Sequence, residues 1–174
     1  MKEKSQLLRP TDESALALAG LLLSKIRWGA LATLAPDGYP LTSLINIAFD
    51  RDGTPLMLAS RLSDHTTNLL ADPRCSLLIS DPGKGDPLAH PRLSLTCNGQ
   101  HITDARETGR YQDIRADFLE HHPKSALYID FPDFLFFRLD LLGARLNGGF
   151  GKAYQLTSSE IYHSPRANHS TQLR

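Results

Sequence analysis

The residues best suited to binding a ligand lie in one short segment, residues 60–68, which reads Ser-Arg-Leu-Ser-Asp-His-Thr-Thr-Asn. We expect this segment to leave a strand and enter a helix, where the free backbone N–H groups of the first turn favour an anion. Arg61 adds a planar fork suited to phosphate, and His65 adds a positive charge when a dianion is near. Hydroxyl donors are supplied by Ser60, Ser63, Thr66 and Thr67. The pattern indicates a site for one phosphate monoester; the alternative is that Ser63 caps the helix and Arg61 is a solvated surface charge.

Two further segments could contact a ring-shaped ligand. Residues 41–45 mix the hydroxyls of Thr42 and Ser43 with apolar side chains, so the polar edge of a flat ring could hydrogen-bond to this strand. The alternative is a hairpin strand with a polar outer face. Residues 148–151 read Gly-Gly-Phe-Gly, which forms either a backbone nest or a bend, and glycine allows a ligand or partner to approach closely.

Several other kinds of site are not indicated. No two of the seven histidines are four residues apart, so the helical spacing of zinc enzymes is absent and we expect no dedicated metal site. The sequence has no P-loop, no G-x-G-x-x-G and no G-x-S-x-G motif.

The elements that would position these residues are short strands with a few helices. Apolar segments between turn residues predict strands at 28–34, 41–49, 55–60, 75–80, 92–102 and 134–146. Helices are predicted from Thr11, as cap, to about residue 26, and at 63–71 and 105–122. We expect residues 28–60 to form an antiparallel three-strand meander. Short antiparallel strands of this kind favour a small barrel, because closure removes exposed sheet edges.

Composition limits the class of protein. A chain of 174 residues predicts one domain, and 19 basic against 19 acidic residues argue against a nucleic-acid or membrane-surface protein. The longest apolar run, residues 15–23, is too short to span a bilayer, and no signal-peptide cleavage site follows it, so we expect a cytoplasmic protein. Zero net charge favours self-association. Cys75 and Cys97 are interpreted as small apolar strand residues, although one bridge between them stays open.

The order of the motifs along residues 26–153 resembles the FMN-binding split-barrel superfamily of the pyridoxamine 5'-phosphate oxidases, and within it the haem-utilisation branch. The segments that carry the resemblance are Gly29-Ala30-Leu31-Ala32-Thr33-Leu34, Asp37-Gly38-Tyr39-Pro40, Ser60-Arg61-Leu62-Ser63-Asp64-His65-Thr66, Asn68-Leu69, Ala71-Asp72-Pro73-Arg74, Asp86-Pro87-Leu88, Pro91-Arg92-Leu93, Tyr111, His122-Pro123 and Gly148-Gly149-Phe150-Gly151-Lys152-Ala153.

This resemblance implies a mainly β (α+β) fold: a six-stranded antiparallel split β-barrel with peripheral helices, forming a homodimer with FMN at its interface. The barrel domain would span residues 1–156, followed by a polar C-terminal tail, 157–174, that we expect to be loose. The positions carried over are Thr42, Ser43 and Leu44 at the isoalloxazine edge, Ser60, Arg61, His65 and Thr66 at the ribityl phosphate, Asn68 nearby, Arg92 reaching the flavin of the other subunit, and Phe150 against the ring.

The sequence departs from the family pattern in three ways. Proteins of the haem branch often carry an extra C-terminal domain with a haem-ligating histidine, whereas here only His163 or His169 could serve, if the tail folds back. The oxidases have a denser Arg/Lys phosphate cluster, and no general base is evident here. The first hypothesis is therefore an FMN-dependent oxidoreductase acting on an unknown small molecule. The alternatives are a haem-binding or haem-utilisation protein, and a non-catalytic flavin-binding or redox-sensing protein.

Overall fold

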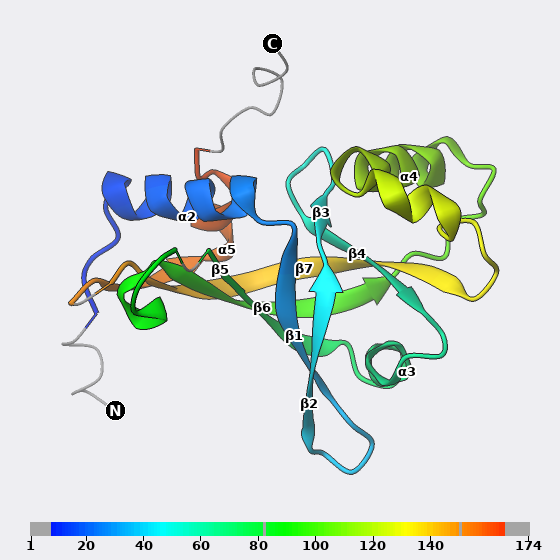
Figure 1. The fold of residues 1–174 in the computed structure, drawn as a ribbon, viewed down its shortest axis with the longest axis horizontal. Coiled ribbons are helices and arrows are strands. Elements are labelled where there is room, and N and C mark those ends of the chain that lie inside the picture. Colours follow the sequence, from blue (N-terminus) through cyan, green and yellow to red (C-terminus); the bar gives the residue numbers. More distant parts are fainter. Residues whose placement is uncertain (1–7, 82, 150, 166–174) are drawn as a thin grey trace. The chain divides into compact units, whose positions relative to one another are not determined.

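A computed structural model describes residues 8–81, 83–149 and 151–165 (Figure 1). The strands are β1 (Trp28–Leu34), β2 (Pro40–Asn46), β3 (Ala48–Phe49), β4 (Pro55–Ser60), β5 (Arg74–Ser80), β6 (Arg92–His101), β7 (Phe134–Asn147) and β8 (Ala153–Thr157). The α-helices are α2 (Glu13–Lys25), α3 (Asp64–Ala71), α4 (Gly109–His121) and α5 (Ser158–Tyr162), and short 3₁₀ turns lie at Pro87–Ala89 and Pro123–Leu127. No helix in the described ranges is long and apolar enough to cross a membrane.

The strands form one sheet in the order β2-β1-β5-β6-β7-β4-β3, with β8 paired to β7. The sheet has eight strands in the described residues, whereas six were predicted. Two differences account for this. The predicted strand 41–49 is divided at the buried Ile47, whose N–H donates to the carbonyl of Arg27 at 2.9 Å, and β8 was not predicted. The predicted meander is correct in its two hairpins but not as three continuous strands, because its middle strand is broken and β4 pairs with β3 and β7. Hairpins β1–β2 and β3–β4 form as expected, but the break at Ile47 directs them to opposite edges of the sheet.

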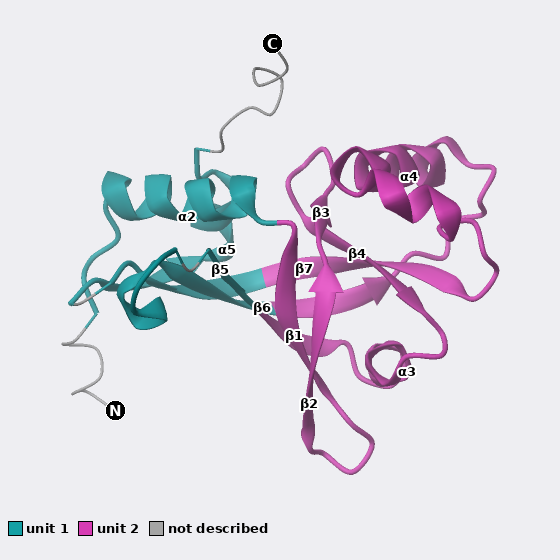
Figure 2. Ribbon diagram, in the orientation of Figure 1, with its two compact units in different colours: residues 1–26, 78–96, 142–174 teal, residues 27–77, 97–141 magenta. Residues whose placement is uncertain are grey.

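The chain divides into two compact units, and β5, β6 and β7 contribute residues to both (Figure 2). The first unit comprises residues up to 26, 78–96 and 142 onwards. Here α2 is capped by Asp12, whose carboxylate accepts from the N–H of Ala15 at 2.8 Å, and not by Thr11 as predicted. The carboxylate is the stronger acceptor for the first-turn N–H groups.

The start of the C-terminal segment is ordered structure in this unit, which corrects the expectation of a loose tail for residues 157–165. Thr157 and Glu160 form a capping box at the start of α5, and α5 contacts α2. Ile161 is fully buried, so this turn of helix contributes to the core. A buried apolar residue behind a capping box is enough to fix a short helix. Residues 166–174, including His169, lie outside the described residues.

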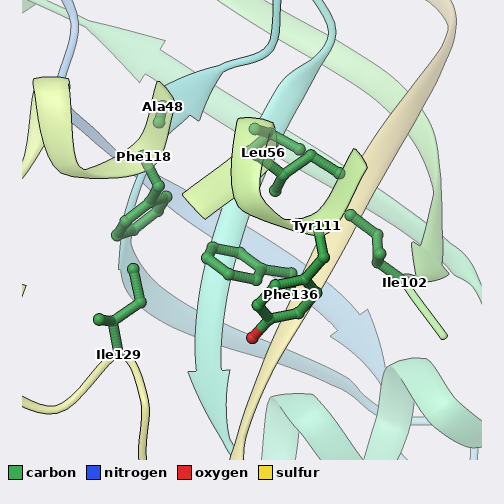
Figure 3. Close-up of a cluster of buried hydrophobic side chains, with 8 residues drawn as sticks. Ala48, Leu56, Ile102, Tyr111, Phe118, Ile129 and Phe136 are labelled. Atoms are coloured by element: carbon green, nitrogen blue, oxygen red, sulfur yellow. The ribbon is translucent and has the colours of Figure 1, made fainter. Parts of the chain in front are cut away.

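The second unit, residues 27–77 and 97–141, has a core between α4 and strands β4 and β7 (Figure 3). Phe136 of β7 lies edge-on to two α4 side chains, with ring centroids 5.5 Å from Tyr111 and 5.6 Å from Phe118. The burial of each of these aromatic side chains stabilises the fold by about 1.5–3 kcal/mol. The helix begins at Gly109, after the Thr108 cap, four residues later than predicted. This core supports the β4–β7 pairing, which ends where Ser60 faces Phe134 across the ladder.

Candidate functional site

The turn that follows β4 is held by an aspartate far away in the sequence. The hydroxyl of Ser60 donates to Asp133 Oδ2 at 2.7 Å and accepts from the N–H of Leu62 at 3.1 Å. The N–H of Arg61 donates to the carbonyl of Asp133 at 2.8 Å. A hydroxyl has one proton to donate. Ser60 has therefore already given its proton to a carboxylate and has none left for an anionic ligand in this conformation.

Helix α3 begins next to this turn, as predicted. Ser63 occupies the N-cap position, although its hydroxyl makes no capping bond within the described residues. The N–H groups of Asp64 and His65 lie in the first turn, where no helical carbonyl is available to them. Burial lowers the pKa of His65, and the carboxylate of Asp64 offsets this only in part. His65 is thus neutral near pH 7, and Arg61 is exposed and cationic.

Two predicted site residues of α3 point into the protein instead of towards solvent. Thr66 is fully buried, and its hydroxyl has no hydrogen-bond partner among the described residues. Asn68 is 3% exposed, and its Nδ2 donates to the hydroxyl of Thr33 in β1 at 3.0 Å. This bond attaches α3 to β1. Among the other polar side chains predicted to hold a phosphate, Arg61 and Thr67 are exposed, and Ser63 and His65 are half-buried, so these four can reach a ligand at the turn.

The predicted ring-binding strand, β2, is an edge strand of the sheet. One row of its backbone groups therefore has no strand partner within residues 8–81, 83–149 and 151–165. Leu44 lies opposite Ala30 of β1, so Thr42 and Leu44 share one face with Trp28, while Ser43 lies on the other face. Leu44 is 73% exposed and Trp28 is 49% exposed. Strand β2 also contacts β4 and α3, which places its edge beside the segment that carries Arg61 and His65.

For the two remaining predicted residues, Arg92 and Phe150, a role at this site stays a prediction. Arg92 belongs to the first unit, where its Nη1 donates to the carbonyl of Leu88 at 3.1 Å. Phe150 lies outside the described residues.

His101, at the end of β6, was missed by the sequence analysis. Burial lowers its pKa, and the positive charge of Arg61 lowers it further, so the two side chains interact electrostatically. Its ring lies 5.6 Å from that of Phe137, centroid to centroid. The sequence indicated only that His101 lies near the end of a predicted strand. That position does not indicate which side chains surround it. Asp133 gave no signal, because its partner Ser60 is 73 residues away.

His101 also lines two surface pockets, of about 490 and 260 Å³. The larger one contains two arginines, each paired with an acid: Arg110 lies 3.5 Å from Asp104, and Arg138 lies 2.9 Å from Asp140. Because its charges are balanced, this pocket has no clear preference for an anion, and the β2 edge with Arg61 and His65 is the better candidate.

The strand order and the helices around the sheet define a split-barrel protein. The structure superposes with a TM-score of 0.66 on a Clostridium acetobutylicum protein of the pyridoxinephosphate oxidase family, related to general stress protein 26, at 16% identity, covering 87% of this chain and all of that one. This confirms the predicted mainly antiparallel α+β split barrel. Residues 10–164 match the CREG β-barrel family, and the chain belongs to that family.

Two relatives have names that refer to haem. The chain is 34% identical over 155 residues to the chloroplastic non-canonical haem oxygenase HOZ of Arabidopsis thaliana, a match that covers 88% of this chain and 44% of the relative. The chain therefore spans less than half of that protein's length. A haem-binding protein from Mycobacterium smegmatis superposes with a TM-score of 0.79 at 28% identity, covering 91% of this chain and 63% of that one.

Proposed function

We propose that this chain binds haem at the β2 edge site, defined as the edge of β2 at residues 42–44 together with Arg61, Leu62 and His65, and that it takes part in haem oxidation or haem utilisation. The observation that carries the proposal is the combination of two exposed apolar side chains, Leu44 and Leu62, with an exposed arginine and a neutral histidine. The haem-related names of two relatives that match most of the chain support it.

The residues of the site match the chemical groups of an iron porphyrin. Leu44 and Leu62, which are 73% and 89% exposed, offer apolar contact to the ring. Arg61 has the planar fork that pairs with a propionate carboxylate. Because burial keeps His65 neutral, its ring nitrogen has a lone pair available for iron. When bound, the haem supplies the chemistry of oxygen activation, while the protein positions it and tunes its electronics.

The charges around the turn favour haem over FMN. A phosphate monoester is a dianion that needs several donors, yet the hydroxyl of Ser60 is committed to Asp133 and that of Thr66 is buried. The carboxylates of Asp64 and Asp133 are close to the same turn. Haem carries its two carboxylates at separate positions on the ring, so Arg61 needs to pair with one of them while the other stays in solvent.

Titration of the purified protein with hemin, followed in the Soret region, tests the proposal. We expect saturable binding, a weaker affinity in Arg61→Ala by about tenfold or more, and an altered Soret band in His65→Ala. Arg74→Ala is the matched control, since Arg74 is also exposed but is paired with Asp72. Absence of a saturable Soret change in the wild type would contradict haem binding. If the Soret band is lost in His163→Ala but kept in His65→Ala, the iron ligand is His163 in the C-terminal segment and not His65.

FMN is the second candidate, and a specific observation favours it. The unpaired backbone edge of β2 could hydrogen-bond a flavin ring, and the first-turn N–H groups of α3 lie beside it. The protein would then be a flavin-dependent oxidoreductase for a small molecule. Flavin absorbance in the purified protein, and a loss of about 1.5–3 kcal/mol of FMN affinity in Arg61→Ala, are expected if this is so. A protein that takes up hemin and no FMN would exclude it.

We also propose a homodimer that covers the exposed face of the β1–β2 hairpin. Trp28 and Leu44 share this face, and the chain has no net charge to oppose association. Light scattering should give twice the chain mass for the wild type and the chain mass for Trp28→Asp. A monomeric wild type would contradict the dimer.

A further inference from the structure

Cys75 and Cys97 lie directly opposite each other on neighbouring strands. The N–H of Gly99 in β6 donates to the carbonyl of Pro73, just before β5, at 2.7 Å. Cys75 lies two residues after Pro73, and Cys97 lies two residues before Gly99. The Sγ of Cys75 donates to the carbonyl of Cys97 at 3.6 Å. The two bonds show that the strands run antiparallel, with Pro73 facing Gly99 and Cys75 facing Cys97.

The geometry of this pair suits a disulfide. Because successive hydrogen-bonded pairs in an antiparallel ladder are two residues apart, Cys75 and Cys97 form a hydrogen-bonded pair, with their Cα atoms about 5.5 Å apart. This separation lies within the range that a disulfide spans. Both thiols are free and on the buried side of the sheet, with residue exposures of 8% and 1%. The two side chains therefore face each other, and no other cysteine in the chain competes for either.

We propose that Cys75 and Cys97 are a reversible redox pair that forms an intramolecular disulfide with hydrogen peroxide as the oxidant. This inference goes beyond haem or flavin binding and does not depend on it. The Cys75 thiolate attacks one peroxide oxygen, the O–O bond breaks, and hydroxide leaves, which gives a sulfenic acid at Cys75. The sulfur of Cys97 then attacks Cys75, the S–S bond forms, and the sulfenic oxygen leaves as hydroxide; the two thiol protons convert both hydroxides to water. In total, two thiols lose two hydrogens and one peroxide becomes two waters.

The surroundings assign different roles to the two cysteines. Hydrogen bonding between the two thiol side chains lowers the pKa of Cys75, whereas the same thiol–thiol interaction, together with burial, raises the pKa of Cys97. Cys75, which is also the more exposed, is therefore the attacking thiol, and Cys97 is the resolving one.

The pair lies next to α3, the helix that carries His65. The side chain of Leu69 covers Gly99, where an added Cβ would lie 2.9 Å from Leu69 Cδ2. A disulfide between Cys75 and Cys97 would fix the strand end on which this helix packs. The oxidation state of the pair could thus be transmitted to α3 through packing.

The experiment exposes the full chain to hydrogen peroxide, alkylates it after denaturation, and measures its intact mass. We expect an unalkylated monomer about 2 Da lighter than the reduced chain, and two alkylated thiols again after treatment with a dithiol. In Cys97→Ser we expect a sulfenic acid on Cys75, which a dimedone probe detects, and in Cys75→Ser a Cys97 that stays reduced at the same peroxide dose. The proposal is overturned if the wild type keeps two alkylatable thiols, if it gains oxygen without losing hydrogen, or if its disulfides join two chains. The wild-type mass alone decides the matter if either variant fails to fold.

Discussion

Arg138 of β7 is surrounded by three carboxylates. Its Nη1 lies 3.0 Å from Asp50 Oδ2 and 3.0 Å from Asp52 Oδ2, and its Nε lies 2.9 Å from Asp140 Oδ1. Burial and the neighbouring Asp52 raise the pKa of Asp50 from 3.8 to about 7, while hydrogen bonds lower the pKa of Asp52. One guanidinium does not neutralise three acids, so Asp50, whose side chain is 11% exposed, keeps its proton.

The linkage between this proton and stability has a definite sign. In the unfolded chain Asp50 loses its proton near pH 3.8, whereas in the folded protein it keeps it up to about pH 7. The stabilising contribution is therefore fully present below the unfolded pKa and is lost as the pH rises through the folded pKa. Asp52 has the opposite sign, but its transition is complete below about pH 5. Between about pH 5 and 7 the loss is about 1.4 kcal/mol per pH unit, or roughly 2–3 kcal/mol in total.

Urea unfolding of the wild type and of Asp50→Asn, from about pH 5 to pH 8, measures this effect. The amide does not titrate, so the free energy of unfolding of the wild type should fall relative to that of the variant by roughly 2–3 kcal/mol between about pH 5 and pH 8. Asp81→Asn, at an exposed aspartate, is the matched control and should follow the wild type at every pH. The lowered pKa values of the partly buried histidines cancel in the difference between variants. A difference that is constant across this range would show that Asp50 is ionised throughout, and would refute the reasoning.

Three further predictions test buried contacts by thermal or urea unfolding of the ligand-free protein. Thr66→Val should raise the free energy of unfolding by about 0.5–1 kcal/mol, because it removes a buried hydroxyl without a partner; a loss would show that this hydroxyl is bonded. Asn68→Ala should lower it by about 1–3 kcal/mol, because it leaves the Thr33 hydroxyl unpaired inside the protein, and an unchanged midpoint would contradict that bond. Gly20→Ala should lower it by about 1–3 kcal/mol, although alanine is the better helix former, because the new Cβ would lie 2.1 Å from the carbonyl oxygen of Pro165. Stabilisation by this last change would mean that α2 does not pack against that carbonyl.

The strands predicted most accurately are those whose limits are set locally. The structure has β1 at Trp28–Leu34 and β4 at Pro55–Ser60, as predicted, because apolar runs between turn residues define both. The partners of these strands were not predictable in the same way. The pairing of β4 with β7 joins residues about 80 positions apart, and it depends on a core that α4 and β7 build together. No local pattern specifies such a partner.

For the candidate site too, the features set by local sequence were predictable, and those set by the fold were not. Residue types and spacing were enough to predict that Arg61 and His65 lie at the start of a helix that follows a strand. They were not enough to predict that Thr66 and Asn68 face inwards, because polar residues on a short helix are normally expected on its exposed side.

The pairing of β4 with β7 also sets the electrostatics of the site. It brings Asp133 next to Ser60, where the carboxylate accepts a hydrogen bond from the hydroxyl and adds a negative charge beside Arg61. Burial removes the charge of His65, and Asp64 adds another carboxylate. A segment whose sequence suggests a cationic phosphate cradle thus has, in the fold, one arginine, two carboxylates and a neutral histidine. An ordinary phosphate site needs donors that are still available, whereas an apolar ring with separate carboxylates needs one cation and an apolar edge. Asp133, which the sequence gave no reason to choose, is therefore the residue that most strongly favours haem over FMN here, and Asp133→Asn is the substitution that should shift the preference back towards FMN in parallel hemin and FMN titrations.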